Sequence, residues 1–235
     1  MKKVIGVAPF AFMGDPQLSC MEDHYKLNNN YVKRVAQSGC TPLCLAPVDN
    51  WLTKEQLDMC DGFVVQGGST YFPYHFQIIH HAVTTGKPYL GICLGEQLIY
   101  TYFKLKEIVE QQGYTGDLVK VICDYRKKTG GVSVLARAEG HRCEKPPRGQ
   151  EDSVKHDINV VKNTLLHKVL GVDSCKISTF HKSCVPADQT LVKVNAWSTD
   201  GVVEGVEYSN NILGIQGHPE IDDKLPQFFE FLAKF

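Results

Sequence analysis

The chain lacks the features that mark several specialised classes of protein. Its 235 residues contain no apolar run long enough to span a bilayer, so we do not expect a membrane-spanning protein. The 25 Lys and Arg residues nearly balance the 26 Asp and Glu residues, and the formal net charge of −1 argues against nucleic acid or an anionic membrane as the main partner. No Ser-, Gly- or Pro-rich linker, repeat or low-complexity tract divides the chain, which predicts a single domain over residues 1–235.

Cysteine is present, but not in the patterns of a disulfide framework or a zinc site. There are nine cysteines, an odd number, and no two of them form a C-x-x-C pair. The one close pair is Cys40 and Cys44, where Pro42 intervenes and no histidine is adjacent, so we expect no metal site there. Several cysteines lie in apparent core positions, which is typical of a reducing compartment, and we therefore expect a cytoplasmic protein.

The start of the chain faintly resembles a signal peptide, because Lys2 and Lys3 precede an apolar stretch. Pro9 interrupts that stretch, and no small-residue cleavage site follows it. A buried strand over residues 3–8 is the favoured interpretation.

Short apolar strands alternate with helical stretches along the chain, which predicts parallel βαβ units and a three-layer α/β/α fold with a mostly parallel sheet, as in flavodoxin-like proteins. We expect strands over 4–8, 42–46, 62–66, 89–92, 154–161, 176–180 and 212–216, and helices over 30–38, 75–85, 98–103, 164–170 and 225–234. Thr199-Asp200-Gly201 lies between two apolar runs and predicts a β-hairpin. Residues 111–153 are less regular, with a loop expected over 145–149.

The most informative stretch is Gly91-Ile92-Cys93-Leu94-Gly95-Glu96-Gln97, which follows a predicted strand and opens a predicted helix. This pattern is the cysteine version of the nucleophile elbow, a strained strand-to-helix turn in which glycines let the chain bend without Cβ clashes. The turn places the sulfur of Cys93 at a helix N-terminus, where free N–H groups and the helix dipole favour thiolate. The alternative is a buried structural cysteine beside two incidental glycines.

A thiolate nucleophile needs a base, and the base needs an orienting group. Gly217-His218-Pro219-Glu220 follows the last predicted strand, and the ends of parallel strands meet at one edge of a sheet. The spacing lets the Glu220 carboxylate reach the His218 imidazole and stabilise its protonated form. Taken alone, the same residues could form an ordinary loop.

Acyl transfer also needs hydrogen-bond donors for the developing oxyanion. Gly67 and Gly68 follow a predicted strand, where a backbone N–H can point into the site, and Leu94 can supply a second N–H. For the two glycines alone, a plain tight turn is the simpler interpretation. His141 has no identifiable partner in the sequence, and neither do His24, His75 and His167.

Together, Gly-Ile-Cys-x-Gly-x-Gln and Gly-x-Gln-x-His-Pro-Glu resemble the signature pair of the class I glutamine amidotransferase-like superfamily. Further segments, in the same order along the chain, resemble its γ-glutamyl hydrolase branch, which includes γ-glutamyl-γ-aminobutyrate hydrolase. These are Gly67-Gly68, His156-Asp157-Ile158-Asn159-Val160, Ser178-Thr179-Phe180-His181 and the segment 200–207. The resemblance implies that Cys93 is the nucleophile, His218 the acid and base, and Glu220 its partner. It also implies that Gln97 helps to hold a γ-glutamyl group, that His181 lines the pocket, and that no metal or organic cofactor is needed.

The chain departs from the closest hydrolases at several positions. Leu94 stands where those enzymes usually carry Arg, although several ammonia-supplying amidotransferases also carry Leu there. Gly217 stands where Trp is common, His181-Lys182-Ser183 replaces His-His-Gln, and residues 102–152 match the branch poorly. We therefore expect hydrolysis of a small γ-glutamyl compound by a stand-alone enzyme or homodimer. The alternatives are a glutaminase subunit that acts on glutamine with a separate synthase, and a non-enzymatic relative that keeps the fold.

Overall fold

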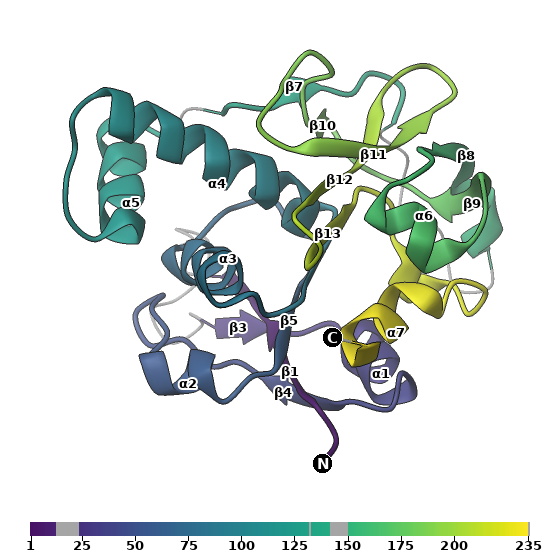
Figure 1. Cartoon of the computed structure of the whole chain (residues 1–235), viewed down its shortest axis with the longest axis horizontal. Coiled ribbons are helices and arrows are strands. Elements are labelled where there is room, and N and C mark those ends of the chain that lie inside the picture. The colour runs from purple at the N-terminus through teal and green to yellow at the C-terminus, as the bar shows by residue number, and fades with distance from the viewer. Residues whose placement is uncertain (13–23, 132, 142–149, 235) are drawn as a thin grey trace.

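A computed structural model describes residues 1–12, 24–131, 133–141 and 150–234, and its centre is a nine-stranded sheet. The strand order is β4-β1-β5-β6-β13-β12-β11-β8-β9. Helices cover both faces of the sheet, as Figure 1 shows. The predicted three-layer α/β/α architecture with a mostly parallel sheet is confirmed.

The strands of this sheet, in chain order, are β1 (Val4–Ala8), β4 (Thr41–Cys44), β5 (Gly62–Val65), β6 (Tyr89–Ile92), β8 (Lys155–Val160), β9 (Ser174–Ser178), β11 (Lys193–Ser198), β12 (Val203–Tyr208) and β13 (Ile212–Ile215). The helices are α1 (Asn29–Gln37), α2 (Lys54–Asp58), α3 (Pro73–Thr85), α4 (Leu94–Gln111), α5 (Leu118–Lys128), α6 (Leu165–Leu170) and α7 (Gln227–Lys234). Two small ribbons pair β2 (Phe10–Phe12) with β3 (His24–Lys26), and β7 (Ala136–Arg137) with β10 (Ser183–Cys184).

The sheet has a parallel half and an antiparallel half. Strands β4, β1, β5, β6 and β13 run parallel, whereas β12, β11, β8 and β9 continue the sheet through antiparallel pairings. The predicted hairpin is the β11–β12 pair, which turns at Thr199-Asp200-Gly201. The antiparallel part is therefore larger than the single hairpin that the sequence indicated.

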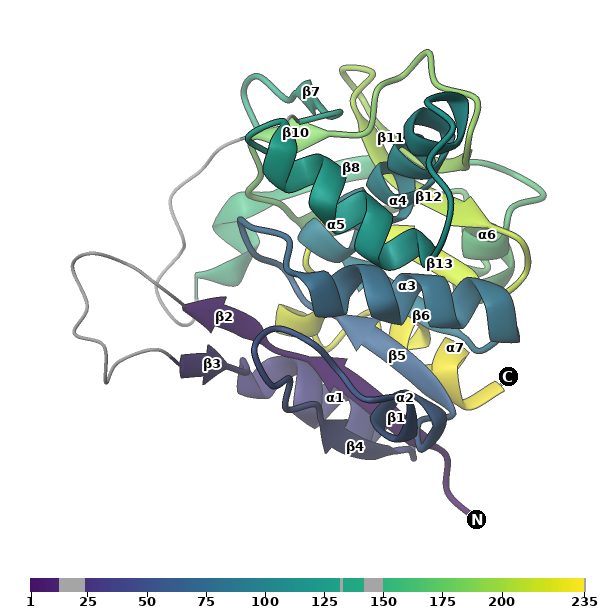
Figure 2. The same cartoon turned by 90° about the vertical axis from the view of Figure 1, so that its left-hand side faces the viewer.

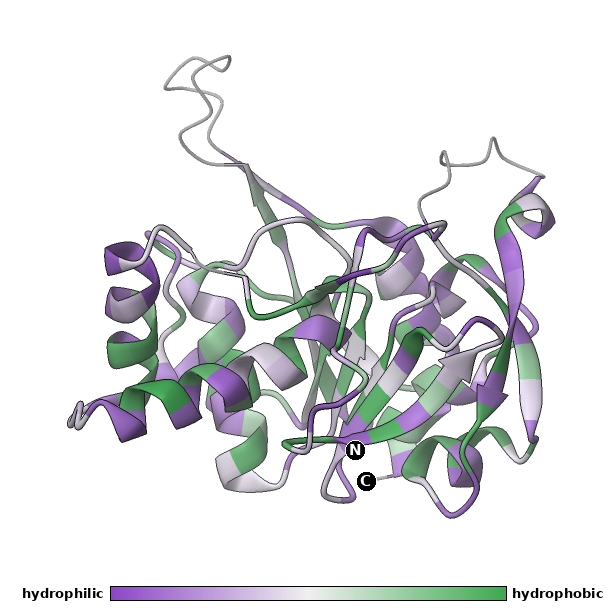
Figure 3. Cartoon of the chain, turned by 90° about the horizontal axis from the view of Figure 1, so that it is seen from above, coloured by the Kyte–Doolittle hydropathy of each residue, from purple (hydrophilic) through white to green (hydrophobic). Residues whose placement is uncertain are grey.

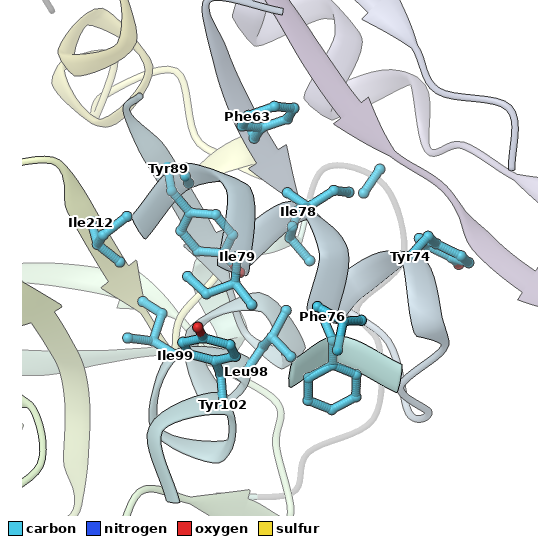
Figure 4. Close-up of a cluster of buried hydrophobic side chains, with 14 of the residues drawn as sticks. Phe63, Tyr74, Phe76, Ile78, Ile79, Tyr89, Leu98, Ile99, Tyr102 and Ile212 are labelled. Carbon is cyan, nitrogen blue, oxygen red and sulfur yellow. The ribbon is translucent and has the colours of Figure 1, made fainter. Parts of the chain in front are cut away.

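The core consists of two apolar layers, one on each face of the sheet. One layer lies between the sheet and α3, α4 and α5, and includes Ile79, Leu98 and Ile99, which Figure 4 shows close together. The other lies under α1, α6 and α7, and includes Val35, Leu166 and Phe228. Figure 2 shows α3 and α5 side by side on the first face, and Figure 3 shows hydrophilic and hydrophobic segments alternating along the flanking helices.

Several local predictions are confirmed and others are corrected. Thr53-Lys54-Glu55-Gln56 in the sequence predicts a capping box at the start of a short helix, and it is present at the start of α2: the Thr53 side chain accepts from the Gln56 N–H, and the Gln56 side chain accepts from the Thr53 N–H. Helix α5 was not predicted, because its many polar residues obscure the helical period. The loop predicted over 145–149 lies outside the described residues. Within the described ranges, no helix is both long enough and apolar enough to cross a membrane.

Candidate active site

Three neighbouring parallel strands end at one edge of the sheet and bring the predicted site together. Register pairs Val65 of β5 with Gly91 of β6, and Gly91 with Gly214 of β13. The segments that follow these strands begin with Gln66, Cys93 and Gln216, and all three residues are buried. Segments far apart in the chain therefore converge where open α/β sheets form their sites.

Cys93 occupies the strained turn that the sequence predicts. Its backbone has φ 54° and ψ −105°, and it is the N-cap residue of α4. Its N–H donates to the Ile215 carbonyl at 2.9 Å, which ties the turn to the end of β13. A Cβ at Gly91 would overlap the Gly95 carbonyl, and a Cβ at Gly95 would overlap the Val65 carbonyl, so both glycines are required by close backbone packing. A non-glycine residue held at positive φ is a form of strain typical of functional sites.

His218 lies between a carboxylate and the Cys93 side chain. Its Nδ1 donates to Glu220 Oε1 over 2.8 Å, and the ring of Phe180 stacks on the imidazole with centroids 4.1 Å apart. Burial by itself would lower the pKa of His218, but the negative charges of Glu220 and Cys93 outweigh it and raise the pKa to about 10. The imidazole therefore carries a proton at neutral pH beside the Cys93 sulfur.

Gly67 is wedged between these side chains. A Cβ on Gly67 would lie 2.9 Å from His218 Cε1 and 3.3 Å from Cys93 Cβ, so the two side chains flank the same point. The Gly67 N–H donates to the Tyr31 hydroxyl at 3.1 Å, so this predicted oxyanion donor already has an acceptor. Gly68 lies beside Leu94, since a Cβ on Gly68 would be 3.0 Å from Leu94 Cδ2. Among the described hydrogen bonds, none takes the N–H of Gly68 or of Leu94.

Gln97 and His181 are both buried, and both side chains donate a hydrogen bond to the same backbone carbonyl, that of Ser183. The Gln97 side-chain amide donates to the Ser183 carbonyl at 2.7 Å and to Gln216 Oε1 at 2.8 Å. The same Ser183 carbonyl accepts from His181 Nδ1 at 3.0 Å. Gln97 thus faces the end of β13, whereas the His181 ring belongs to a cluster of histidines on the antiparallel half of the sheet.

Sequence reasoning missed Tyr31 and the role of Phe180, and its account of His141 was wrong. The Tyr31 hydroxyl is buried against Glu220, and burial followed by that negative charge raises the pKa of Tyr31 well above its usual range. His141 contacts Asp200, His181 and Glu204, although no partner was expected. The sequence signal available for Tyr31 was a hydroxyl on the buried face of a predicted helix, and such a signal names no partner.

Gly217 also has a local explanation. A Cβ at this position would lie 2.7 Å from the Ile177 side chain, so the packing of β9 leaves no room for the Trp that is common there in the hydrolase branch. The departure changes the wall of the site beside His218 and leaves the imidazole in place.

Comparison with known proteins agrees with this architecture. A profile of the peptidase C26 family matches residues 3–78 and 73–220. Protein NtpR from Enterococcus hirae is 23% identical over 214 aligned residues, covering 81% of this chain and 80% of the relative.

Solved structures share the fold. The glutaminase domain of CTPS from Trypanosoma brucei, with bound acivicin, superposes with a TM-score of 0.63 at 16% identity, covering 99% of this chain and 93% of that chain. A glutamine amidotransferase from Thermotoga maritima gives a TM-score of 0.55 at 15% identity, covering 94% and 77%. The profile match spans both the elbow at Cys93 and the His218–Glu220 segment, which places the chain among cysteine-dependent amide hydrolases. This protein belongs to the peptidase C26 family.

Proposed function

We propose that this protein hydrolyses the γ-glutamyl amide bond of a small γ-glutamyl compound through a thioester on Cys93. The observation that carries the proposal is the arrangement of Cys93 at a strained helix N-terminus beside His218, which is itself bonded to Glu220 at 2.8 Å. Nucleophile, base and orienting carboxylate are the three parts that such a reaction needs.

In the first half of the reaction, the Cys93 thiolate attacks the γ-carbonyl carbon and forms a tetrahedral intermediate. The intermediate collapses as the C–N bond breaks, and protonated His218 gives its proton to the leaving amine. In the second half, neutral His218 takes a proton from water, the hydroxide attacks the thioester, and the thiolate leaves with glutamate as the product. Glu220 stabilises the imidazolium that is present before the first half and forms again in the second half.

The developing oxyanion requires two well-aimed donors. The N–H groups of Gly68 and Leu94 suit this role, because the Gly67 N–H is already bonded to Tyr31. Tyr31 would then act as a positioning residue that holds the turn at Gly67 against the imidazole. Gln97 supports recognition of the γ-glutamyl portion, and His181 supports it indirectly by donating to the Ser183 carbonyl that also accepts from Gln97.

The test is a panel of γ-glutamyl amines and glutamine, assayed for release of glutamate with the unmodified protein, Cys93→Ala and Cys44→Ala. Cys44 is an exposed cysteine on β4 and serves as the matched control. We expect Cys93→Ala to lose at least about a thousandfold in rate and Cys44→Ala to retain full activity. Turnover retained in Cys93→Ala would exclude the thiolate mechanism.

Covalent labelling separates an enzyme from a non-enzymatic relative. Acivicin is bound in the glutaminase domain from Trypanosoma brucei. We expect the peptide that carries Cys93 to gain the mass of one acivicin-derived group. A chain that keeps only the fold would leave this peptide unlabelled.

The second candidate is a glutaminase subunit that supplies ammonia to a separate synthase. It is favoured by Leu94, which stands where the closest hydrolases usually carry Arg and lies directly beside Gly68. For this candidate, glutamine turnover should rise when a cell extract or a candidate synthase is added. Turnover that is unchanged by any addition, together with rapid cleavage of one γ-glutamyl amine, favours the stand-alone hydrolase.

A further inference from the structure

Three histidines and one glutamate meet on the antiparallel half of the sheet, outside the residues that carry the proposed hydrolysis chemistry. We call His141, His156, His181 and Glu204 the histidine–glutamate cluster. The side chains of His141, His181 and Glu204 are 5%, 1% and 0% exposed, so three of the four members are shielded from water. His156 on β8 is 24% exposed and closes the cluster on its outer side. Burying so many ionisable groups together is costly unless something neutralises them.

Three ligand-type atoms of the cluster form a nearly equilateral triangle. His141 Nδ1 lies 3.2 Å from His181 Nε2 and 3.1 Å from Glu204 Oε1, and His181 Nε2 lies 3.3 Å from Glu204 Oε1. The fourth member approaches the other carboxylate oxygen, with His156 Nε2 at 3.4 Å from Glu204 Oε2. His141, His156 and Glu204 each offer one ligand atom, and these three atoms lie within 4.8 Å of one another.

The outer hydrogen bonds determine which ring nitrogens carry protons. His141 Nε2 donates to Asp200 Oδ2 at 3.0 Å, and His181 Nδ1 donates to the Ser183 carbonyl at 3.0 Å. In neutral rings, the protons on these outer nitrogens leave His141 Nδ1 and His181 Nε2 as lone pairs. Both lone pairs face each other and a carboxylate oxygen, so neutral rings alone would give three acceptors in contact with no donor between them.

We propose that the histidine–glutamate cluster binds one divalent transition metal ion of the zinc class through His141 Nδ1, His181 Nε2 and Glu204, with His156 Nε2 as the fourth ligand. Ligand atoms at about 2.0–2.1 Å from a tetrahedral zinc ion are about 3.3 Å apart, which agrees with the sides of the triangle. Imidazole nitrogen and carboxylate oxygen are ligands that zinc accepts.

The surroundings of the cluster match those of metal sites in a second respect. Histidine ligands usually donate their other N–H to a carboxylate or a carbonyl, as His141 does to Asp200 and His181 does to Ser183. The Ser183 carbonyl also accepts from Gln97, so the ion would brace the segment that holds this side chain. The site is structural in this interpretation, and it goes beyond the proposed hydrolysis, which needs no metal.

The competing arrangement replaces the ion by one proton. His181 would then be an imidazolium ion whose Nε2–H lies between His141 Nδ1 and Glu204 Oε1, while its Nδ1–H stays on the Ser183 carbonyl. Burial opposes the charge of this ring, and the Glu204 carboxylate favours it. One metal ion contacts all three ligand atoms at once, and metal titration distinguishes the two arrangements.

The experiment is metal binding by the full chain after treatment with a chelator and dialysis. We expect one equivalent of Zn²⁺ to bind in a calorimetric titration and to raise the melting temperature. Co²⁺ should bind at the same stoichiometry with visible bands of a nitrogen and oxygen site. His141→Ala should weaken Zn²⁺ binding by at least about a hundredfold, and Asp200→Asn, which removes only an outer partner, by about 10- to 100-fold.

The matched control is His167→Ala. His167 is a half-buried histidine that bonds to Asp173 at 3.0 Å and is not a member of the cluster, so its loss should leave metal affinity unchanged. No binding by the unmodified chain, or affinity that is equal in His141→Ala and in His167→Ala, would overturn the proposal. A strong sulfur-to-cobalt charge-transfer band would also overturn it, because the ion would then sit on one of the cysteines. None of these measurements depends on the hydrolysis reaction, so the two proposals can fail separately.

Discussion

The parallel and antiparallel halves of the sheet each bury a glutamate, and the two carboxyl groups have opposite fates. Glu96 on α4 packs beside Gly214 with neither oxygen bonded to a described residue, and burial, followed by the charges of Glu204 and Cys93, raises its pKa well above the usual range. Glu204 on β12 is equally buried. Burial would raise its pKa, but the neighbouring imidazoles of His156 and His181 outweigh burial and lower it. Burial alone therefore does not decide charge, and the available partners do.

The same contrast holds for the two clusters of side chains that we propose to act in hydrolysis and in metal binding. In the parallel half, strand ends meet at one edge, so topology alone gathers Cys93 and His218. In the antiparallel half, the histidine–glutamate cluster draws on β8, β12 and two connecting segments, and only side-chain packing brings its members together.

Glu220→Gln should have the largest effect. It keeps the shape of the side chain but removes a negative charge that raises the pKa of His218 to about 10. The proton that His218 gives to the leaving amine is then lost at lower pH, so the basic limb of the rate profile should move to lower pH, with rates reduced about 10²- to 10⁴-fold. Glu230→Gln, on the exposed face of α7, is the control. An unshifted basic limb would contradict this account.

Gly95→Ala and Gly205→Ala compare the halves directly. A Cβ at Gly95 would lie 2.3 Å from the Val65 backbone carbonyl oxygen, whereas a Cβ at Gly205 would overlap the end of the Asn195 side chain and lie 3.0 Å from the Gly214 carbonyl oxygen. We expect losses of about 3 kcal/mol and about 1 kcal/mol in the free energy of unfolding, measured by urea denaturation. Equal losses would show that the elbow is no more tightly packed than the antiparallel strands.

Glu96→Gln tests the neutral carboxyl. Above about pH 4.3 the unfolded chain releases the Glu96 proton while the folded chain keeps it, so folding becomes less favourable as pH rises. The glutamine variant has no such proton to release. We expect the free energy of unfolding of the variant, relative to that of the unmodified protein, to rise by about 1 kcal/mol per pH unit from pH 5 to 6, measured by denaturation at each pH. Parallel stability curves would mean that Glu96 is ionised in the fold.

Tyr31→Phe should have the smallest effect and the most specific one. It removes the hydroxyl that accepts from the Gly67 N–H, and we expect a loss of about 1 kcal/mol in stability and about tenfold in kcat/KM. Tyr74→Phe is the matched control, because its buried hydroxyl donates to the Pro9 carbonyl at 2.9 Å and the described hydrogen bonds link it to none of Cys93, His218 and Gly67. Tyr74→Phe should lose stability alone, and an equal fall in kcat/KM for both variants would remove Tyr31 from the site.

Much of the fold was predictable because its signals are local. The run Tyr89–Ile92 has only apolar side chains and glycine and forms a fully buried strand, and Gly39 ends its helix at φ 86° as a glycine at this position predicts. Helix α5 was missed because its polar surface hides the apolar face formed by Val119, Ile122 and Cys123. The extent of the antiparallel half was also missed, because strand order depends on long-range pairing that no local pattern encodes.

What the sequence by itself determined is the set of residues whose geometry depends on close neighbours along the chain. Gly91 and Gly95 allow the sharp turn at Cys93. Pro219 holds His218 and Glu220 so that His218 Nδ1 lies 2.8 Å from Glu220 Oε1. Only the tertiary structure decided that Tyr31 takes the N–H of Gly67, and that His141 lies against Glu204 from 63 positions away. The physical reason is that backbone sterics act over a few bonds, whereas buried polar groups find their partners only after packing has excluded water.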